Sequence, residues 1–344
     1  MEISLQSIGE NSTAIFYELR WNGTICCPEC GSVQVYNPEP GKLHICKDCR
    51  NRFSDTSGTI FHSTKLSLSK WLYCIYLFLS SSRGVSSYSI ARNIGVSQKT
   101  AWSMLTKLRE CLHRDIKFSS DEQVAIDEVY LGANWKYKPA FKKYKEAGEP
   151  PEEIIEKWNE GDPDQIKWKR KSWYKKRFMK LASDDKVPVL GMVSLTPQSI
   201  KICLVDISSS DGRKSVRDEI CTHFEDVLGE MFVDTPQTIV CDQSKLYEFL
   251  DEVLDENNNR KFKRVVCRHD MNQYGKDGLS SNRIEAAFSH LRRMWRGVYT
   301  RWSRKYNQLY LDEFCFRYNN PLSDKGVITN RIKELFRGIE RSCG

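Results

Sequence analysis

The sequence predicts a multi-domain protein in which a small cysteine-rich module and a helical region precede an α/β domain, a mixed sheet flanked by helices. Three observations predict this order: two CxxC pairs near the N-terminus, helices joined by a short Gly-containing turn, and a later alternation of strand-like and helix-like segments. We expect the cysteine module with its lead-in at 1–64, the helical region at 65–118, the α/β domain at 119–322 and a C-terminal tail at 323–344.

Composition and length are those of a folded protein. The chain has 344 residues, of which 40% are hydrophobic and 28% charged, which excludes a wholly disordered chain and suits two or three domains. There is no long apolar run for a transmembrane helix and no basic region followed by an apolar stretch for a signal peptide. We therefore expect an intracellular protein.

The cysteine pattern predicts a metal site. An odd total of 13 cysteines in an intracellular chain disfavours a disulfide framework. Four of them form the motifs CPECG and CKDC, separated by a segment with β-type residues: Cys27, Cys30, Cys46 and Cys49. Two such pairs on a short hairpin can complete a tetrahedral site of four thiolates for structural Zn²⁺, which predicts a zinc ribbon. Cys26 competes with Cys27, but only Cys27 gives the CPxCG form.

The helical region predicts paired helices. Apolar residues recur at helical spacing in a segment that starts at Leu68 or Ser69 and stops at Ser80–Ser82, and again on both sides of Gly95. Gly95 and the capping residue Ser97 separate two helices in the manner of a helix-turn-helix motif. In that geometry four residues near the start of the second helix would face a DNA major groove: Gln98, Lys99, Thr100 and Ser103. The alternative is an ordinary helical hairpin.

The α/β domain alternates strands and helices. Strand-like segments occupy 123–131, 187–195, 200–206, 238–242 and 264–268, and helical segments occupy 213–228, 244–254 and 281–296. Three strands in a meander followed by alternating units predict a mixed sheet with flanking helices. A polar insertion at 134–180 is acidic first and then basic and aromatic, and we expect it to contact DNA or a partner.

Two aspartates lie at strand positions that suit metal binding or catalysis. Asp127 stands mid-strand between Ile126 and Val129, where a buried acid is costly unless it is paired or binds a metal. Asp242 ends the fourth strand, and ligands favour the carboxyl ends of strands in open α/β sheets. For each aspartate taken singly, a hydrogen-bonded structural role is the alternative.

The helix at 281–296 supplies a third carboxylate. Its predicted core stripe consists of Ile284, Phe288, Leu291 and Trp295. Glu285 falls on nearly the opposite face, together with Asn282 and Arg292. Three carboxylates, from Asp127, Asp242 and Glu285, could bind two divalent ions for phosphoryl transfer. Hard oxygen ligands favour Mg²⁺ or Mn²⁺, whereas the alternative is a solvated helix face.

Positive charge concentrates around the same helix. Residues 261–306 contain twelve Lys or Arg and three Asp or Glu, a larger excess than the net charge of +8 of the whole chain. Such clustering indicates a polyanionic partner, most often nucleic acid. Arg292, Arg293 and Arg296 are the candidates to follow a DNA phosphate backbone; a solvated basic face is the alternative.

Taken together, these segments resemble the DDE-type insertion-sequence transposases with an N-terminal zinc ribbon, the bacterial relatives of the Merlin group of DNA transposons. The resemblance rests on CPECG…CKDC with RFSDTSGTIFHSTKLSLSKW, on SIARNIGVSQKTAWSMLTKLR, on AIDEVYLG and VCDQS, and on SNRIEAAFSHLRRMWRGVY with YLDEFCFRYN. These segments span most of residues 25–320 in the family's order. The ribbon and the last run are the most specific.

The resemblance implies a ribonuclease H-like fold for the α/β domain and catalytic roles for Asp127 and Asp242. The third residue belongs to the family's N-x-x-E motif, here Asn282 and Glu285. We favour Glu285 because a carboxylate is the better metal ligand, with Asn282 as a substitute or helper. The basic residue seven positions later, often Lys in similar proteins, is Arg292. The sequence departs from the family in lacking the usual His before the motif and in its long insertion.

The resemblance also implies a function and partners. A transposase of this kind binds the terminal inverted repeats of an insertion sequence and catalyses metal-dependent strand cleavage and strand transfer to target DNA. We expect a homodimer or higher homo-oligomer in a synaptic complex, in the cytoplasm at the nucleoid if the host is bacterial. Two alternatives remain: a metal-dependent nuclease without strand transfer, and a DNA-binding regulator built from the ribbon and the helix-turn-helix.

Overall fold

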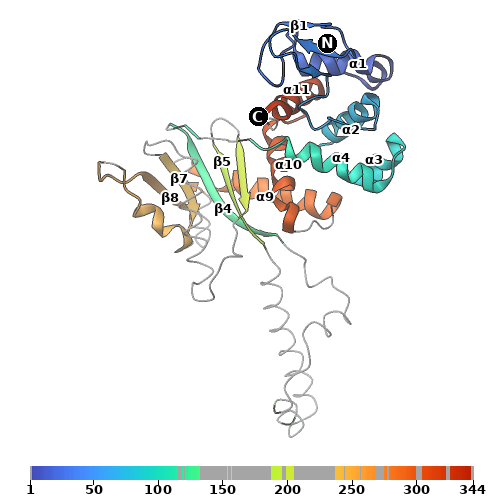
Figure 1. Ribbon diagram of the computed structural model, residues 1–344. Coiled ribbons are helices and arrows are strands. Elements are labelled where there is room, and N and C mark those ends of the chain that lie inside the picture. Colours follow the sequence, from blue (N-terminus) through green and yellow to red (C-terminus); the bar gives the residue numbers. More distant parts are fainter. Residues whose placement is uncertain are drawn as a thin grey trace. The chain divides into compact units, whose positions relative to one another are not determined.

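A computed structural model of the chain describes residues 2–114, 118–119, 121–131, 153, 156, 187–195, 199–204, 237–243, 245–255, 257–267, 275–276, 279–299, 304–322 and 326–341. The elements are labelled in Figure 1. The predicted helix 213–228 lies outside these residues, as does the insertion 134–180 apart from Glu153 and Glu156. No helix among the described residues is long and apolar enough to cross a membrane.

The chain divides into two compact units. One consists of Met1–Asp127, Gly191–Cys203 and Glu225–Gly344, and the other of Glu128–Leu190 and Leu204–Phe224. The first unit contains the ribbon, the helical region and the carboxyl-terminal helices, and it carries the residues discussed below.

The ribbon is a small antiparallel sheet. Its strands are β1 (Val35–Tyr36), β2 (His44–Cys46) and β3 (Arg52–Phe53), with β2 in the centre. The predicted hairpin between the two CxxC pairs is confirmed. Its core is minimal, since the buried residues are Trp21, Ile25, Cys27, Cys46 and Phe53. A module with so little apolar burial depends on a cross-link for stability.

Residues 5–21, expected only as a lead-in to the cysteine module, form helix α1 (Leu5–Trp21). Ser4 caps the helix by accepting a hydrogen bond from the Ser7 N–H at 3.2 Å. One face is buried, with Ile8, Ile15, Phe16 and Leu19 at helical spacing. A kink at Asn11, with φ −134°, interrupts the helix between the first of these residues and the rest, which obscures the periodicity.

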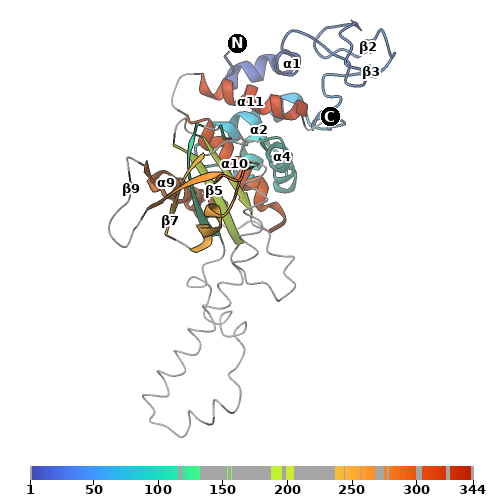
Figure 2. The same ribbon diagram turned by 90° about the vertical axis from the view of Figure 1, so that its left-hand side faces the viewer.

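Five further helices share the core with α1. They are α2 (Leu68–Ser80), α3 (Ser87–Ile94), α4 (Gln98–Glu110), α10 (Asn307–Asn319) and α11 (Val327–Arg341). The helix predicted to start at Leu68 or Ser69 is confirmed as α2. The prediction of a C-terminal tail at 323–344 is wrong, because residues 327–341 form α11. Helix α11 lies beside α1 and α2 (Figure 2). It buries Ile332, Leu335, Phe336 and Ile339, an apolar stripe that pairs with helices about 300 residues earlier in the chain.

In the described part of the α/β region, five strands form one sheet in the order β6-β5-β4-β7-β8. The strands are β4 (Gln123–Leu131), β5 (Val187–Ser194), β6 (Ile200–Leu204), β7 (Gln237–Asp242) and β8 (Phe262–Cys267). Strands β4, β7 and β8 run parallel, and the Ser194 N–H at the end of β5 donates to the Ser199 carbonyl, just before β6, at 2.9 Å. The predicted mixed sheet is confirmed (Figure 1). The predicted helix 244–254 is instead a 3₁₀ helix, η2 (Lys245–Asp251).

Helices flank this sheet, as predicted. A short hairpin, β9 (Gly275–Lys276) and β10 (Leu279–Ser280), precedes α9 (Asn282–Met294), and α9 runs into a π-helix, η4 (Trp295–Tyr299). A 3₁₀ turn, η5 (Arg304–Tyr306), leads into α10 (Asn307–Asn319). Helix α9 packs on β5 at Gly191, where an added Cβ would lie 2.7 Å from the Phe288 ring and 2.9 Å from the Ile284 side chain.

Candidate functional site

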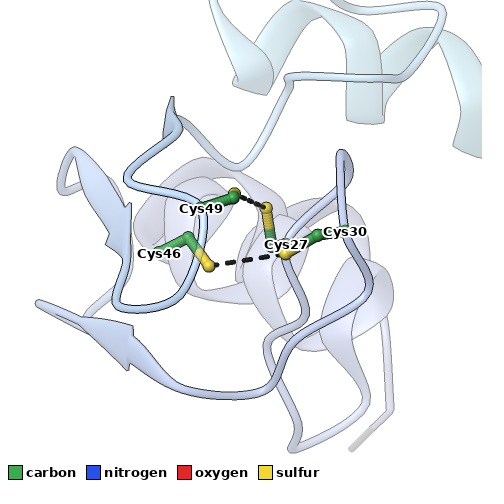
Figure 3. A group of neighbouring side chains, drawn as sticks. All are labelled: Cys27, Cys30, Cys46 and Cys49. Carbon is green, nitrogen blue, oxygen red and sulfur yellow. Dashed lines mark hydrogen bonds between the residues drawn. The ribbon is translucent and has the colours of Figure 1, made fainter.

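The four cysteines of the two CxxC motifs converge. Their Sγ atoms all lie within 4.8 Å of one another (Figure 3). The Sγ atoms of Cys27 and Cys49 are 3.6 Å apart, as are those of Cys30 and Cys46. Four thiolates around Zn²⁺ at about 2.3 Å in a tetrahedron have sulfur–sulfur separations of about 3.8 Å. The sulfur positions therefore fit a structural zinc ion without rearrangement.

The surroundings favour the thiolate form at Cys27 and Cys46. At Cys30 and Cys49 the backbone donors of Ser32 and Asn51 also lower the pKa, but burial and the neighbouring thiols outweigh them and raise the pKa, that of Cys49 to about 12. Backbone N–H groups, that of Cys49 first and that of Asp48 next, lower the pKa of Cys46 to about 6. Burial opposes ionisation of Cys27, but the backbone donors of Cys30 and Glu29 outweigh it and lower the pKa of Cys27. Since metals bind the thiolate, these donors prepare the cluster for zinc.

A buried carboxylate that the sequence analysis did not single out ties the ribbon to α1. Asp55, 4% exposed, accepts hydrogen bonds from Trp21 Nε1 at 2.8 Å and from the Gly41 N–H at 2.8 Å. His44 Nε2 lies 2.9 Å from Asp55 Oδ1, and His44 Nδ1 lies 2.7 Å from the Asn37 carbonyl. The sequence around Asp55 does not predict its role, because its hydrogen-bond partners come from other segments of the chain.

Asp127 and Asp242 occupy equivalent positions on neighbouring strands. Strands β4 and β7 are parallel, and their register pairs Ala125 with Val240. Asp127 and Asp242 lie two residues beyond the last pair on each strand, and this register, if continued, would make them neighbours on one face of the sheet. Adjacent strands lie about 4.8 Å apart. Both aspartates are half-buried, so the deep burial that would make a mid-strand acid costly is not found.

The start of α9 lies at the same edge of the sheet. Strand β8 pairs Cys267 with Asp242. Burial raises the pKa of the Cys267 thiol, the backbone of Ser281 hydrogen-bonds to that thiol and lowers its pKa, and the charge of Glu285 raises it further. Ser281 Oγ donates to Glu285 Oε1 at 3.0 Å. Glu285 is therefore electrostatically linked to the strand beside Asp242, and Asn282 lies exposed on the same helix.

The three carboxylates do not form a tight cluster. Within the described ranges, the four cysteines are the group of three or more potential ligands whose atoms converge. Asp127 and Asp242 thus lie near the last paired positions of β4 and β7, and Ser281 connects Glu285 with Cys267 at the end of β8. Carboxylate oxygens suit hard divalent cations, so the donor set fits Mg²⁺ or Mn²⁺.

Helices α3 and α4 form the predicted pair. Gly95 ends α3 with φ 65°, a left-handed conformation that favours glycine, and Ser97 caps α4 by accepting from the Thr100 N–H at 3.1 Å. The Thr100 hydroxyl lies 2.8 Å from Ser97 Oγ, so it belongs to the cap. Gln98 Nε2 donates to Ser87 Oγ at 2.8 Å, which bridges the two helices.

The candidate DNA-contacting side chains are largely exposed. On α4, Gln98, Lys99 and Ser103 are exposed and Thr100 is half-buried. On the other candidate surface, Arg292, Arg293 and Arg296 are all exposed. The predicted core stripe of α9 is buried at Ile284, Phe288 and Leu291, while Trp295 is only half-buried because it begins the π-helix.

Comparison with known families agrees with these features. Residues 119–319 match the ISXO2-like transposase domain, and residues 10–52 match the transposase zinc-ribbon domain. Because the first match covers more than half of the chain, the protein belongs to the ISXO2-like family of insertion-sequence transposases. The resemblance to zinc-ribbon DDE transposases is confirmed.

One relative is itself part of a mobile element. A protein described as "uncharacterized protein in transposable element ISH50", from Halobacterium salinarum, is 27% identical over 127 residues. The aligned region covers 35% of this chain and 40% of that protein, well under two thirds of its length. No solved structure matches the chain significantly.

Proposed function

We propose that this transposase binds the terminal inverted repeats of its insertion sequence and catalyses metal-dependent strand cleavage followed by strand transfer to target DNA. One observation carries the proposal: the β4–β7 register, continued by two residues, makes Asp127 and Asp242 neighbours on parallel strands. Membership of the transposase family implies a DNA-directed activity of this class. The mixed sheet with strand order β6-β5-β4-β7-β8 supports a ribonuclease H-like catalytic domain.

Asp127, Asp242 and Glu285 would hold the catalytic Mg²⁺ or Mn²⁺, with Asn282 as the alternative third residue. When bound, divalent ions supply an activated nucleophile and stabilise charge on the scissile phosphate. The Glu285 side chain is oriented by the Ser281 hydroxyl. Without bound cations, adjacent carboxylates would repel a phosphate, so the side chains by themselves do not favour DNA at this edge.

DNA recognition would be divided between two surfaces. Gln98, Lys99 and Ser103 on α4 would read base edges, while Thr100 would fix the helix start. Arg292, Arg293 and Arg296 on α9 would hold phosphates close to the carboxylates. Since transposition joins two ends, we propose a homodimer or higher oligomer as the active species. In a bacterial host it would act in the cytoplasm, at the nucleoid.

A strand-transfer assay with the element's own ends tests the proposal. Asp127→Asn and Asp242→Asn should lower cleavage and joining by at least about a hundredfold while leaving end binding intact, because a neutral amide is a poor ligand for divalent ions. Asp121→Asn, an exposed aspartate before β4, is the matched control. Full strand transfer by Asp127→Asn would contradict the proposed metal site.

Comparing Glu285→Gln with Asn282→Ala identifies the third residue. Loss of activity in Glu285→Gln with an active Asn282→Ala supports Glu285, and the reverse result supports Asn282. Wild-type protein that cleaves ends without joining them would be a nuclease, and one that binds ends without cleaving would be a regulator.

A further inference from the structure

A buried ionic cluster joins α4 to α10 and to the segment that follows α9. Glu313 on α10 accepts a hydrogen bond from Arg109 Nε at 2.7 Å, from Arg317 Nη2 at 2.7 Å and from the Tyr299 hydroxyl at 2.7 Å. Arg109 comes from α4, and Tyr299 is the last residue of the π-helix η4. We call Arg109, Tyr299, Glu313 and Arg317 the buried cluster.

The buried cluster tolerates little rearrangement. Glu313 is fully buried, and Arg109 and Arg317 are 2% and 5% exposed. Burial opposes ionisation of Glu313, but the charges of Arg317 and Arg109 hold the pKa of its carboxyl below the usual value. Breaking a buried charge network leaves uncompensated charges, so its members move together or not at all. The network is therefore a rigid connection between its elements.

The Tyr299 hydroxyl takes part in two hydrogen bonds, one with Glu313 and one with the loop before α3. Besides donating to Glu313, it accepts a hydrogen bond from the Val85 N–H at 3.3 Å, in the loop that leads into α3. Gly84 makes this approach possible, since a Cβ at that position would lie 2.2 Å from the Tyr299 hydroxyl. One hydroxyl thus contacts the entrance to α3 and the carboxylate that holds α4.

The π-helix extends this connection to α9. Helix α9 carries Glu285 and Asn282 in its first turn and continues into η4 without a break. π-Helical turns are rare and occur frequently at functional sites. One continuous helical segment therefore connects Tyr299 with Asn282 and Glu285.

We infer that Tyr299 is a positioning residue which couples DNA binding at α3 and α4 to the placement of α9 at the carboxylates. The inference rests on the proposed function, because it takes α4 as the DNA-reading helix and α9 as the catalytic helix. The coupling makes cleavage depend on correct engagement of a terminal repeat, which restricts strand cleavage to transposon ends.

Tyr299→Phe tests the coupling with the smallest change. It keeps the ring, which packs 4.7 Å from the Tyr310 ring, and removes only the hydroxyl. Tyr318→Phe, on α10 and outside the buried cluster, is the matched control. With full-length protein and a duplex carrying the terminal repeat, Tyr299→Phe should bind within twofold of Tyr318→Phe. It should melt at a lower temperature, because buried Glu313 loses one hydrogen bond, but remain folded at the assay temperature. Its cleavage of bound ends should be at least tenfold slower.

Hydrogen exchange provides a readout independent of catalysis. Binding of the terminal-repeat duplex should slow amide exchange in residues 282–299 of the wild-type protein, and a random duplex of equal length should not. At equal occupancy, Tyr299→Phe should show no such change.

The outcomes separate the coupling from the proposed function. The coupling is overturned if Tyr299→Phe cleaves bound ends as fast as Tyr318→Phe, or if its DNA binding falls along with its cleavage, which marks a merely structural residue. Wild-type protein that binds ends without cleaving them contradicts the proposed function, while the exchange measurement still decides the coupling. Protein without preference for terminal repeats overturns both.

Discussion

The four-cysteine cluster does not include Cys26, although Cys26 directly precedes Cys27 in the sequence. Cys26 is exposed and lies outside the four-sulfur cluster, whereas Cys30 belongs to it. Cys30→Ser should therefore lose the zinc ion, and Cys26→Ser should keep about one per chain, because structural zinc needs four protein ligands. Metal analysis of the purified variants measures this. Zinc retained by Cys30→Ser, or lost by Cys26→Ser, would show that the ligands are wrongly assigned.

Some functional residues of the ribbon can be predicted from the sequence, and others cannot. The sequence predicts four cysteines as metal ligands because a CxxC pair is a local pattern with one common chemical use: Cys27, Cys30, Cys46 and Cys49. Asp55 could not, since its role depends on meeting Trp21, Gly41 and His44, which only the folded ribbon brings together.

Among the elements, α9 can pack closely on the sheet because Gly191 has no side chain. Gly191→Ala would drive a methyl group into the Phe288 ring, so we expect a loss of about 1–3 kcal/mol in unfolding free energy from overpacking. Strand cleavage should fall as well, since α9 carries Glu285. Chemical denaturation and the cleavage assay provide the two measurements.

Gly297→Ala is the matched control, because an added Cβ there meets nothing within 4 Å. Combining Gly191→Ala with Phe288→Leu should restore part of both properties by making room for the methyl group. Wild-type stability in Gly191→Ala would mean that α9 does not pack closely on β5.

Two elements should contribute to DNA binding in different ways. Gln98→Ala with Lys99→Ala on α4 should reduce the preference for terminal repeats over random DNA, because base-edge contacts give specificity. Arg292→Ala or Arg296→Ala on α9 should weaken binding to both DNAs alike. Each arginine that contacts a phosphate should lower the slope of log affinity against log salt by about 0.9.

Binding titrations at several salt concentrations separate the two effects, and Lys333→Ala, exposed on α11, is the control. A salt slope that changes in the α4 variant while specificity stays constant would contradict the division between base reading and phosphate contact.

On the scale of the whole molecule, the two ends of the chain stabilise each other. The Phe336 ring on α11 packs 5.6 Å from that of Phe16 on α1 and 6.0 Å from that of Phe61. Phe336→Ala should cost about 3–5 kcal/mol, as is typical for a buried phenylalanine, while the exposed Lys333→Ala should cost little. Urea denaturation of the full chain gives both values, and equal midpoints would contradict the shared core.

This packing also changes how the DNA-binding region is best tested. Removing residues 1–115 would strip α10 and α11 of α1, α2 and α4, with which they share buried residues. Point variants on exposed faces are therefore the sharper test of recognition.

The sequence alone predicts the four-cysteine cluster, the strands of the sheet, the helix pair around Gly95 and the exposed face of α9, because each is a short pattern with a local physical cause. Folding in three dimensions is needed to see that α1 and α11 complete one core, that β4 and β7 pair in parallel through Ala125 and Val240, and that Glu313 gathers Arg109, Arg317 and Tyr299. These features join segments more than a hundred residues apart or the ends of separate helices. Their energy comes from excluding water around specific partners, and local periodicity does not identify those partners.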